Sequence, residues 1–500
     1  MFSGSETTAT VVIVLLGLGV LGWGLSRSLP FGKLGILAWL QSVVLMLPWV
    51  IFFGLFAAGI YLNLIGILLL LVISTGLYII IGRQLREAGQ DAILREKAAK
   101  ILQTALEEAA KSEGNENQEP LTAIKIEIPT IPDEDLKKIK GIFGIDTFFA
   151  IETIPYLEGA IFKGNLRGEP DKVHGKLSEM LAERVGDRYR LFLVENQDEK
   201  PTVVVLPQSA DPPTPGIPQL ILAVVLLLTS IATTLGSSGV LLGFDLFSNL
   251  GRIKEVLPIS AGLLTVLAAH EIGHFITAKK YNVKLDFPLF IPSGQIASFG
   301  AITRFGSVLP NRNVFFDIAL AGPAFGGIVS LLMLIVGLSL SHPGSLFQVP
   351  TEFFRGSLLV GTLAKVVLGN AIHQAIVNVH PLAIIGWLGL VITALNLMPA
   401  GQLDGGRIVQ SIYGRKIAGR TTIATLILLG IIAIFNPGNS VVLYWGILIL
   451  FLQRGQERPA LNDISEPDDA RAALGLLALF LMAATLIPLT PDLAGRLGIG

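Results

Sequence analysis

Two histidines, His270 and His274, lie four positions apart in an apolar stretch and enclose a carboxylate, Glu271. In an α-helix this spacing puts both imidazoles on one face, one turn apart. Two imidazoles so placed can bind a single Zn²⁺, with the glutamate beside them to take a proton from water. The alternative is a pair of histidines packed against neighbours, but ionisable groups inside apolar helices are costly and usually functional. The spacing therefore favours a metal site.

A catalytic zinc site needs a third protein ligand and one open position. The sequence has no cysteine, so this ligand must be His, Asp or Glu. Asp404 is the leading candidate, because it ends an apolar run in which Pro399 and several glycines interrupt the helix. Irregular backbone at membrane depth is tolerated where it lines a cavity. The alternative is a glycine-capped helix end with Asp404 in the polar rim of the membrane.

The composition places these residues in a membrane. Of the 500 residues, 52% are hydrophobic and 15% are charged, against about 25% charged in ordinary globular proteins. The mean hydropathy is +0.66. Residues 34–82 contain no charged residue and no histidine, which is long enough for two spans of about 20 residues each. We predict a polytopic α-helical membrane protein with about 8–12 transmembrane helices, and a lipid bilayer around it. Apolar runs with few or no charges mark the expected spans, which are 7–26, 34–58, 60–82, 217–240, 256–278, 316–341, 381–403, 421–435, 439–453 and 472–491.

Several classes of protein are excluded. A net charge of −1 provides no basic field for nucleic acid. Without cysteine there is no disulfide framework, no thiolate metal site and no cysteine nucleophile. The first apolar run, 7–26, lacks a small-residue cleavage site, and no Arg- and Ser-rich transit segment precedes it. We therefore expect a retained first helix.

A change in charge density divides the chain. Charged residues gather after residue 82, and residues 160–164, 190–194 and 201–206 have strand patterns around a helical pattern at 172–184. We predict five regions, which are N-terminal transmembrane helices (1–82), a charged helix and linker (83–120), a small soluble α/β domain inserted after the first three helices (121–210), a core with both motifs (211–410) and C-terminal transmembrane helices (411–500). The Lys and Arg bias places the helix ends near His274 and Asp404 at one membrane face.

The two motifs together resemble a known family. His270-Glu271-Ile272-Gly273-His274, followed by Asn-x-x-Pro-x-x-x-Leu-Asp-Gly at 396–405, is similar to the site-2 protease family of intramembrane zinc metalloproteases. Ala321-Gly322-Pro323 also agrees. Gly164-Asn165-Leu166-Arg167-Gly168 resembles a motif of the ethylene-dependent gravitropism-deficient and yellow-green branch of cyanobacteria and chloroplasts. The resemblance covers roughly 217–410 and implies a zinc metalloendopeptidase that hydrolyses peptide bonds in or near transmembrane segments.

Matching positions imply a role for each residue. His270, His274 and Asp404 would bind one Zn²⁺ per chain, Glu271 would be the general base, and Asn396 would contact substrate or oxyanion near the site. The implied partners are membrane proteins with a transmembrane helix, and the implied location is the plasma or thylakoid membrane of a cyanobacterium. No PDZ-like insertion separates the motifs, which leaves 121–210 as the regulatory or docking module.

Residues 287–304 contain prolines and glycines that do not suit a span. As in the family, we expect a short membrane-associated sheet that pairs by its edge with an unwound substrate; the alternative is a connecting loop.

Two other functions compete with proteolysis. A transporter would have internal repeats with paired broken helices, and we find no such repetition. A non-proteolytic metal-binding scaffold is compatible with an intact site.

Overall fold

The computed structural model describes residues 131–500 with gaps at 157, 197–198, 214, 295, 437–439, 451–454, 498 and 500. Before residue 131 it describes α2 (Gly32–Ala57) and scattered residues between 21 and 85. Nearly all of the charged region predicted at 83–120 and most of the first predicted helix lie outside the described residues. The chain forms two compact units, one of residues 1–125 with 430–440 and one of 126–429 with 441–500. The larger unit contains both motifs.

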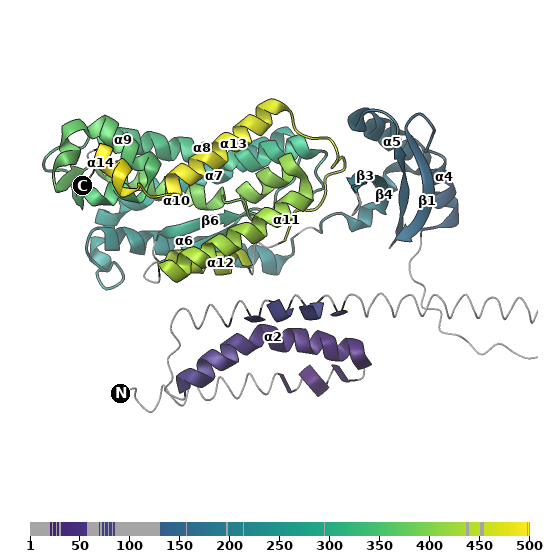
Figure 1. Ribbon diagram of the computed structural model, residues 1–500, viewed down its shortest axis with the longest axis horizontal. Coiled ribbons are helices and arrows are strands. Elements are labelled where there is room, and N and C mark those ends of the chain that lie inside the picture. The colour runs from purple at the N-terminus through teal and green to yellow at the C-terminus, as the bar shows by residue number, and fades with distance from the viewer. Residues whose placement is uncertain are drawn as a thin grey trace, which may run out of the picture. The chain divides into compact units, whose positions relative to one another are not determined.

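The larger unit begins with a four-stranded antiparallel sheet in the order β1-β2-β4-β3. Its elements are α4 (Asp133–Lys140), β1 (Phe148–Tyr156), β2 (Gly159–Leu166), α5 (Pro170–Val185), β3 (Tyr189–Glu195) and β4 (Pro201–Pro207). Alternate strand residues such as Leu191 and Leu193 face a buried core, which α4 and α5 cover on one side of the sheet (Figure 1). In α5, Val173 and Leu177 belong to a buried stripe at four-residue spacing. The three predicted strands and the predicted helix are confirmed.

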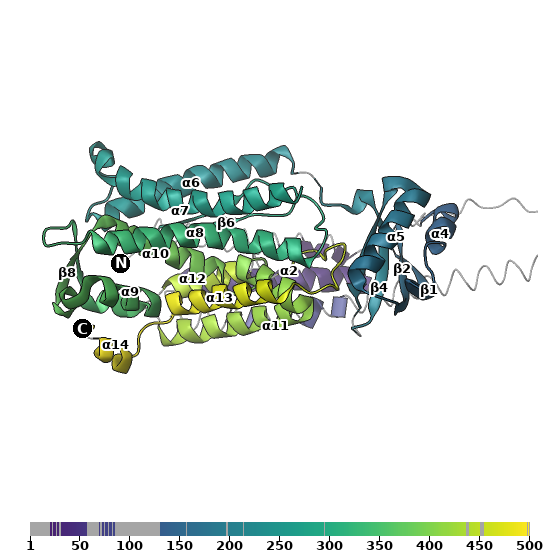
Figure 2. The same ribbon diagram turned by 90° about the horizontal axis from the view of Figure 1, so that it is seen from above.

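The membrane-spanning part consists of long apolar helices. Among the described residues, five helices are long and apolar enough to cross a bilayer, namely α6 (Ile217–Leu241), α7 (Ile253–Lys280), α8 (Arg312–Ser339), α11 (Asp404–Phe435) and α13 (Asp469–Leu486). Figure 2 shows α6, α7 and α8 side by side. The other short elements are β7 (Phe347–Pro350), α9 (Leu358–Leu368), β8 (Ile376–Val379), α12 (Ser440–Leu448) and α14 (Pro491–Leu497). The protein is therefore a multi-pass helical membrane protein with a small sheet-containing domain before these helices.

Two predicted spans have different limits in the structure. The apolar run 381–403 forms only α10 (Pro381–Asn396), and the chain then turns before α11 begins at Asp404. The span predicted at 421–435 is the second part of α11, which has a kink at Gly414. The first part was missed because it carries polar side chains such as Arg407 and Gln410, which are buried against other protein groups. Asp404 therefore begins a helix and is not part of a capped helix end.

Glycines allow α7, α8 and α10 to pack at very short distance. A β-carbon on Gly273 of α7 would lie 2.5 Å from the carbonyl oxygen of Ala321 in α8. On the other side of α8, a β-carbon on Gly386 of α10 would lie 2.3 Å from the backbone nitrogen of Leu334. Small residues at these positions bring the helix backbones together, as is common between membrane helices. This packing fixes the helices that carry the two motifs.

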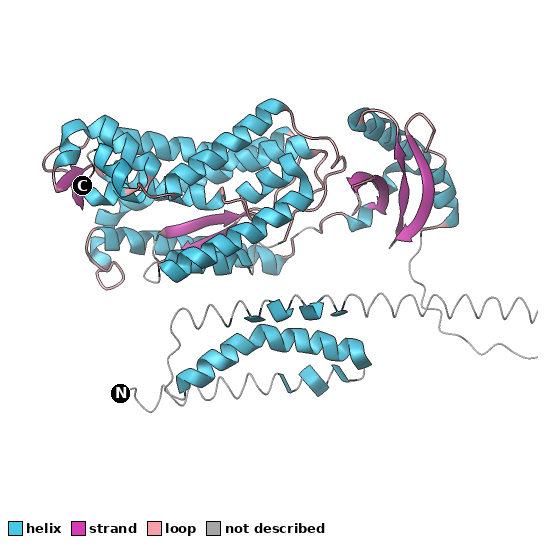
Figure 3. Ribbon diagram, viewed as in Figure 1, coloured by secondary structure: helices cyan, strands magenta, loops and turns pink. Residues whose placement is uncertain are grey.

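A β-hairpin lies among these helices (Figure 3). It consists of β5 (Leu289–Ser293) and β6 (Ala297–Ile302), paired antiparallel with an irregularity between Phe290 and Pro292. Thr233 of α6 donates a hydrogen bond of 2.9 Å to the carbonyl of Ala297, and the ring of Phe299 stacks on Trp445 of α12. The sheet predicted within 287–304 is thus present as two strands.

Candidate metal centre

His270, His274 and Asp404 converge in the interior of the larger unit. Nε2 of His270 lies 3.1 Å from Oδ2 of Asp404 and 3.2 Å from Nε2 of His274. Nε2 of His274 lies 3.4 Å from Oδ1 of Asp404. The three residues are 5%, 3% and 7% exposed. The structure therefore brings together the three residues that the sequence predicted as ligands, and among the described residues no other group of His, Asp and Glu side chains meets the geometry of a metal site.

The spacing of these atoms fits a tetrahedral zinc ion. Ligand atoms about 2.0–2.2 Å from Zn²⁺ lie about 3.3–3.6 Å from one another in a tetrahedron. The three pairs of atoms described above are 3.1–3.4 Å apart, with one oxygen of Asp404 toward each histidine, and these separations lie within a few tenths of an ångström of the tetrahedral values. With three protein ligands, a fourth position would be open for water or substrate, as in a catalytic site.

The hydrogen bond of His274 suits a metal ligand. Its Nδ1 lies 2.8 Å from the carbonyl oxygen of Ile318, which can only accept, so Nδ1 carries a proton. In the neutral tautomer Nε2 then has a lone pair directed toward the carboxylate of Asp404, where both groups could bind one cation. A backbone carbonyl that holds the far nitrogen is the usual support for a metal-binding histidine.

Glycines on α8 make room for both imidazoles. A β-carbon on Gly322 would lie 2.2 Å from Nε2 of His274, and one on Gly326 would lie 3.1 Å from the β-carbon of His270. The two glycines are four residues apart, so they follow the spacing of the histidines along the facing helix. This explains the Ala321-Gly322-Pro323 similarity, whereas Gly326 and Ile318 were not identified from the sequence.

A tight turn between α10 and α11 presents Asp404. Gly401 has a φ of 51°, and its N–H donates a hydrogen bond of 2.8 Å to the hydroxyl of Thr422. A β-carbon on Gly405 would lie 1.8 Å from the carbonyl oxygen of Leu397. Only glycine fits there, and the turn leaves Asp404 in the first turn of α11, where the helix dipole favours a carboxylate.

Glu271 is held by the residue that follows β6. The hydroxyl of Thr303 donates a hydrogen bond of 2.6 Å to Oε2 of Glu271. Thr303 is 6% exposed. The structure thus connects the predicted general base to the hairpin. Sequence reasoning missed Thr303, since a threonine 32 positions from Glu271 carries no spacing signal.

Asn396 lies at the end of α10 and contacts the same hairpin. Its Nδ2 donates to the carbonyl oxygens of Phe299 at 3.2 Å and Ile392 at 3.0 Å. Gly300 has a φ of +92°, and a β-carbon there would lie 2.4 Å from this Nδ2. The side chain is 4% exposed. Asn396 therefore helps to hold β6 in place.

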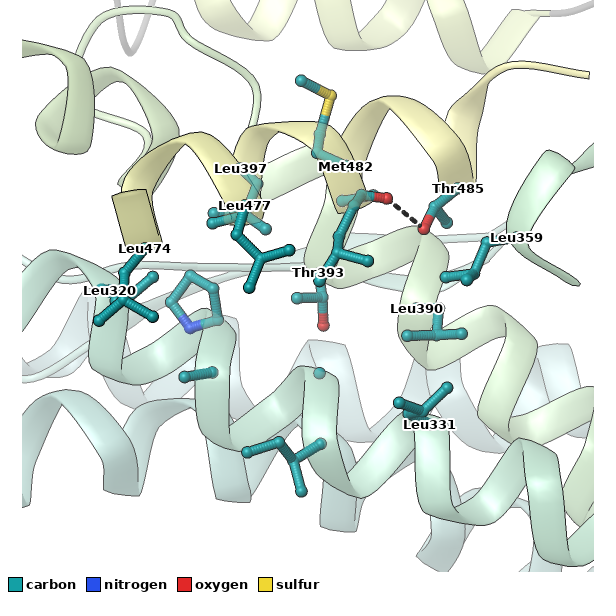
Figure 4. Close-up of a pocket in the computed structure, with 17 residues that line it drawn as sticks. Leu320, Leu331, Leu359, Leu390, Thr393, Leu397, Leu474, Leu477, Met482 and Thr485 are labelled. Atoms are coloured by element: carbon teal, nitrogen blue, oxygen red, sulfur yellow. Dashed lines mark hydrogen bonds between the residues drawn. The ribbon is translucent and has the colours of Figure 1, made fainter. Parts of the chain in front are cut away.

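A separate apolar cavity of about 330 Å³ lies between α8, α10 and α13. Figure 4 shows leucines around it, with Thr393 and Thr485 on its wall. His270, His274 and Asp404 do not line it. Oγ1 of Thr393 is buried and has no hydrogen-bond partner among the residues that the structure describes, whereas Oγ1 of Thr485 donates to the carbonyl of Leu481. This cavity is distinct from the metal centre.

Comparison with known proteins gives two family matches. Residues 258–436 match peptidase family M50, and residues 137–213 match the EGY3 middle domain. The probable zinc metalloprotease EGY2, chloroplastic, of Arabidopsis thaliana is 39% identical over 366 residues, which are 72% of this chain and 65% of that protein. The probable zinc metalloprotease EGY1, chloroplastic, of the same plant is 37% identical over 411 residues, covering 73% of each. The chain thus spans about two thirds or somewhat more of these relatives, and no solved structure is significantly similar.

Proposed function

This chain belongs to peptidase family M50, and we propose that it is an intramembrane zinc metalloprotease that hydrolyses peptide bonds in or near transmembrane segments of membrane proteins. The observation that carries the proposal is the convergence of His270, His274 and Asp404 next to Glu271 within apolar helices. A transporter would not need these groups at zinc-binding distances. No comparison favours a transporter or a non-proteolytic scaffold.

In the proposed mechanism His270, His274 and Asp404 hold one zinc ion. Zinc bound there supplies a Lewis acid that lowers the pKa of water toward about 7 and polarises the scissile carbonyl. Glu271 accepts the proton of the attacking water and delivers it to the leaving amine. The hydrogen bond from Thr303 fixes the orientation of the Glu271 carboxylate. Burial of the three ligands keeps competing solvent away from them.

We further propose that the hairpin presents the substrate. A transmembrane helix hides its amide bonds in hydrogen bonds, so it must unwind before hydrolysis. An unwound segment can pair with the edge of a sheet. Strand β6 ends next to Thr303, which contacts Glu271, and Asn396 fixes the strand at Phe299. A peptide that pairs along β6 would pass the general base, and Asn396 would then act near the substrate.

The location proposed for the protein is the plasma or thylakoid membrane of a cyanobacterium. The Gly164–Gly168 motif, which begins on β2, supports this, as do relatives named chloroplastic. Fractionation of the source cells with an antibody against residues 131–207 tests it. Recovery outside both membranes would contradict it.

Metal content and cleavage measured together test the function. The full-length protein and a Glu271→Gln variant are purified in detergent, assayed for zinc and given a panel of single-span membrane proteins. One zinc per chain in both samples, with cleavage by the wild type alone, supports the proposal and the role of Glu271. Zinc without cleavage across the panel favours the scaffold. A folded protein without stoichiometric zinc overturns the metalloprotease.

A further inference from the structure

Arg407 lies at the centre of a buried network beside the metal centre. It is 3% exposed, and its Nη1 lies 3.7 Å from Oδ1 of Asp404. Nη2 donates to the carbonyl oxygen of Thr303 at 2.5 Å. Nε and Nη2 donate to Oε1 of Glu457 at 3.0 and 2.5 Å. A single guanidinium therefore connects a metal ligand, the residue that holds Glu271, and a distant carboxylate.

The charges explain why Glu457 is needed. A buried arginine requires a counter-ion, and the carboxylate of Asp404 is directed at the two histidines. Glu457 supplies the negative charge, so that Arg407 can orient Asp404 and Thr303 without drawing Asp404 away from the imidazoles. Arg407 is thus suited to hold both the ligand and the general base in place.

Glu457 is itself held by α11. Its backbone N–H donates to Oε1 of Gln410, and Nε2 of Gln410 donates back to its carbonyl, both at 3.2 Å. Arg415 also donates to the Glu457 carbonyl, and Nε2 of Gln456 donates to the Arg415 carbonyl at 2.6 Å. These reciprocal bonds fix the position of residues 456–457 on the helix that begins with Asp404.

Four residues later, the same segment reaches the soluble domain. The N–H of Leu193 on β3 donates to the carbonyl of Leu461 at 2.7 Å, and the N–H of Asp463 donates to the carbonyl of Leu193 at 2.9 Å. On its other side, Asn462 pairs with Asn311, the N-cap of α8. Nδ2 of Asn462 donates to Asp171 of α5 at 2.5 Å. Residues 461–463 therefore form isolated β-bridges with the sheet edge on one side and with the start of α8 on the other.

We propose that Arg407 is a positioning residue for the metal centre and that segment 456–463 couples it to the docking of the soluble domain on β3. The coupling rests on the proposed function, and it assigns a regulatory role to the domain. A rigid linker transmits displacement, and only three residues, Pro459 among them, lie between Glu457 and Leu461. Any partner that moves β3 away from Leu461 thereby shifts Glu457, releases Arg407 and lowers activity. Because such coupling is reciprocal, a change at the metal centre must also change how tightly β3 docks on Leu461.

Full-length protein loaded with Co²⁺ in place of zinc tests the coupling without proteolysis, because the visible absorption of Co²⁺ reports ligand geometry. Two variants act at opposite ends of the network: Arg407→Met with Glu457→Gln, which replaces the buried pair by uncharged groups, and Asn462→Ala. The matched control is Glu199→Ala. Glu199 pairs with Lys416 and so joins the same domain to α11 without the segment. Cleavage kinetics are measured on the same variants.

Both test variants are expected to bind one metal ion and to change the cobalt spectrum, whereas Glu199→Ala reproduces that of the wild type. We expect kcat to fall about tenfold for the Arg407 variant and about threefold for Asn462→Ala, with KM changed less than about twofold. When the Arg407 variant and Asn462→Ala are combined, their effects on kcat will not be additive. Wild-type spectra and kcat in both variants overturn the coupling alone. A wild-type chain that binds no Co²⁺ overturns the proposed function, and the coupling with it.

Discussion

The hydroxyl of Thr303 donates a hydrogen bond of 2.6 Å to Oε2 of Glu271. One residue follows β6, and the other lies between the two histidines of α7. The strand proposed to present the substrate and the proposed general base are therefore directly connected. A carboxylate fixed by a neutral donor loses rotational freedom, which suits a base that must meet water in one orientation.

Thr303→Val should lower kcat about tenfold while one zinc per chain is retained, because the carboxylate of Glu271 loses its orienting hydrogen bond. Zinc content and cleavage of a membrane substrate in detergent measure the two effects. Thr233→Val is the matched control. Thr233 donates to the carbonyl of Ala297 on the same hairpin and does not contact Glu271. A kcat that falls equally in both variants would show that the hydroxyl supports only the hairpin.

The sequence was sufficient to predict which three residues converge at the candidate metal centre, but not the residues that support them. His270 and His274 follow from helix geometry, because four residues make about one turn, and Asp404 follows from the types of residue that can complete a zinc site. Thr303 and Arg407 contact the site through tertiary packing, and neither has a spacing that distinguishes it from other polar residues. Their roles emerge only when β6 and α11 are placed beside α7.

For the membrane helices, too, the sequence predicted the apolar segments but not the buried polar contacts. Apolar runs predicted α6, α7, α8 and α13 closely, since lipid-facing helices must be apolar throughout. The first part of α11 was missed because its polar side chains bond within the protein. The prolines and glycines of 287–304 argued only against a span, and the sheet was expected from the family resemblance; its hydrogen bond from Asn396 was not predicted. Patterns of hydrophobicity describe what faces lipid and carry little information about buried polar contacts.

Gly322→Ala should abolish stoichiometric zinc binding. Its β-carbon would lie 2.2 Å from Nε2 of His274, so the imidazole must leave its position. Gly327→Ala on the same helix is the control, because its β-carbon would meet only the methyl group of Thr393 at 3.6 Å. Metal analysis of both folded variants gives the answer. Zinc retained by Gly322→Ala would mean that His274 is not a ligand in this orientation.

Thr393→Val should stabilise the protein by about 1 kcal/mol, because it removes a buried hydroxyl that has no hydrogen-bond partner. Thr485→Val on the wall of the same cavity (Figure 4) removes a hydroxyl that donates to Leu481 at 2.8 Å and should not stabilise. Thermal unfolding in detergent compares the two. Equal shifts of Tm would show that the hydroxyl of Thr393 is bonded in solution. Neither variant should change kcat, since the metal ligands do not line this cavity.

Acid should weaken the soluble domain through Asp135. Burial alone would raise the pKa of this carboxyl, but hydrogen bonds from Arg188, both 2.8 Å, and from Tyr189, 3.0 Å, outweigh it and hold the pKa below its ordinary value of 3.8. A depressed pKa contributes stability above the unfolded value, and this contribution is lost as the pH falls through the folded pKa. The loss should therefore begin below about pH 4.

The same contacts should weaken the domain in alkali. Burial and the neighbouring Asp135 raise the pKa of Tyr189 to about 12, so above about pH 10 the unfolded chain loses a proton that the folded domain keeps, and stability falls. Hydrogen exchange of α4 and β3 in the full-length protein measures both the loss of stability in acid and the loss in alkali. In Asp135→Asn the acid loss should disappear. In Glu152→Gln, which breaks an exposed pair with Lys163, it should persist, because exposed pairs contribute little. If the loss of stability in acid were unchanged in Asp135→Asn, another group would be its cause.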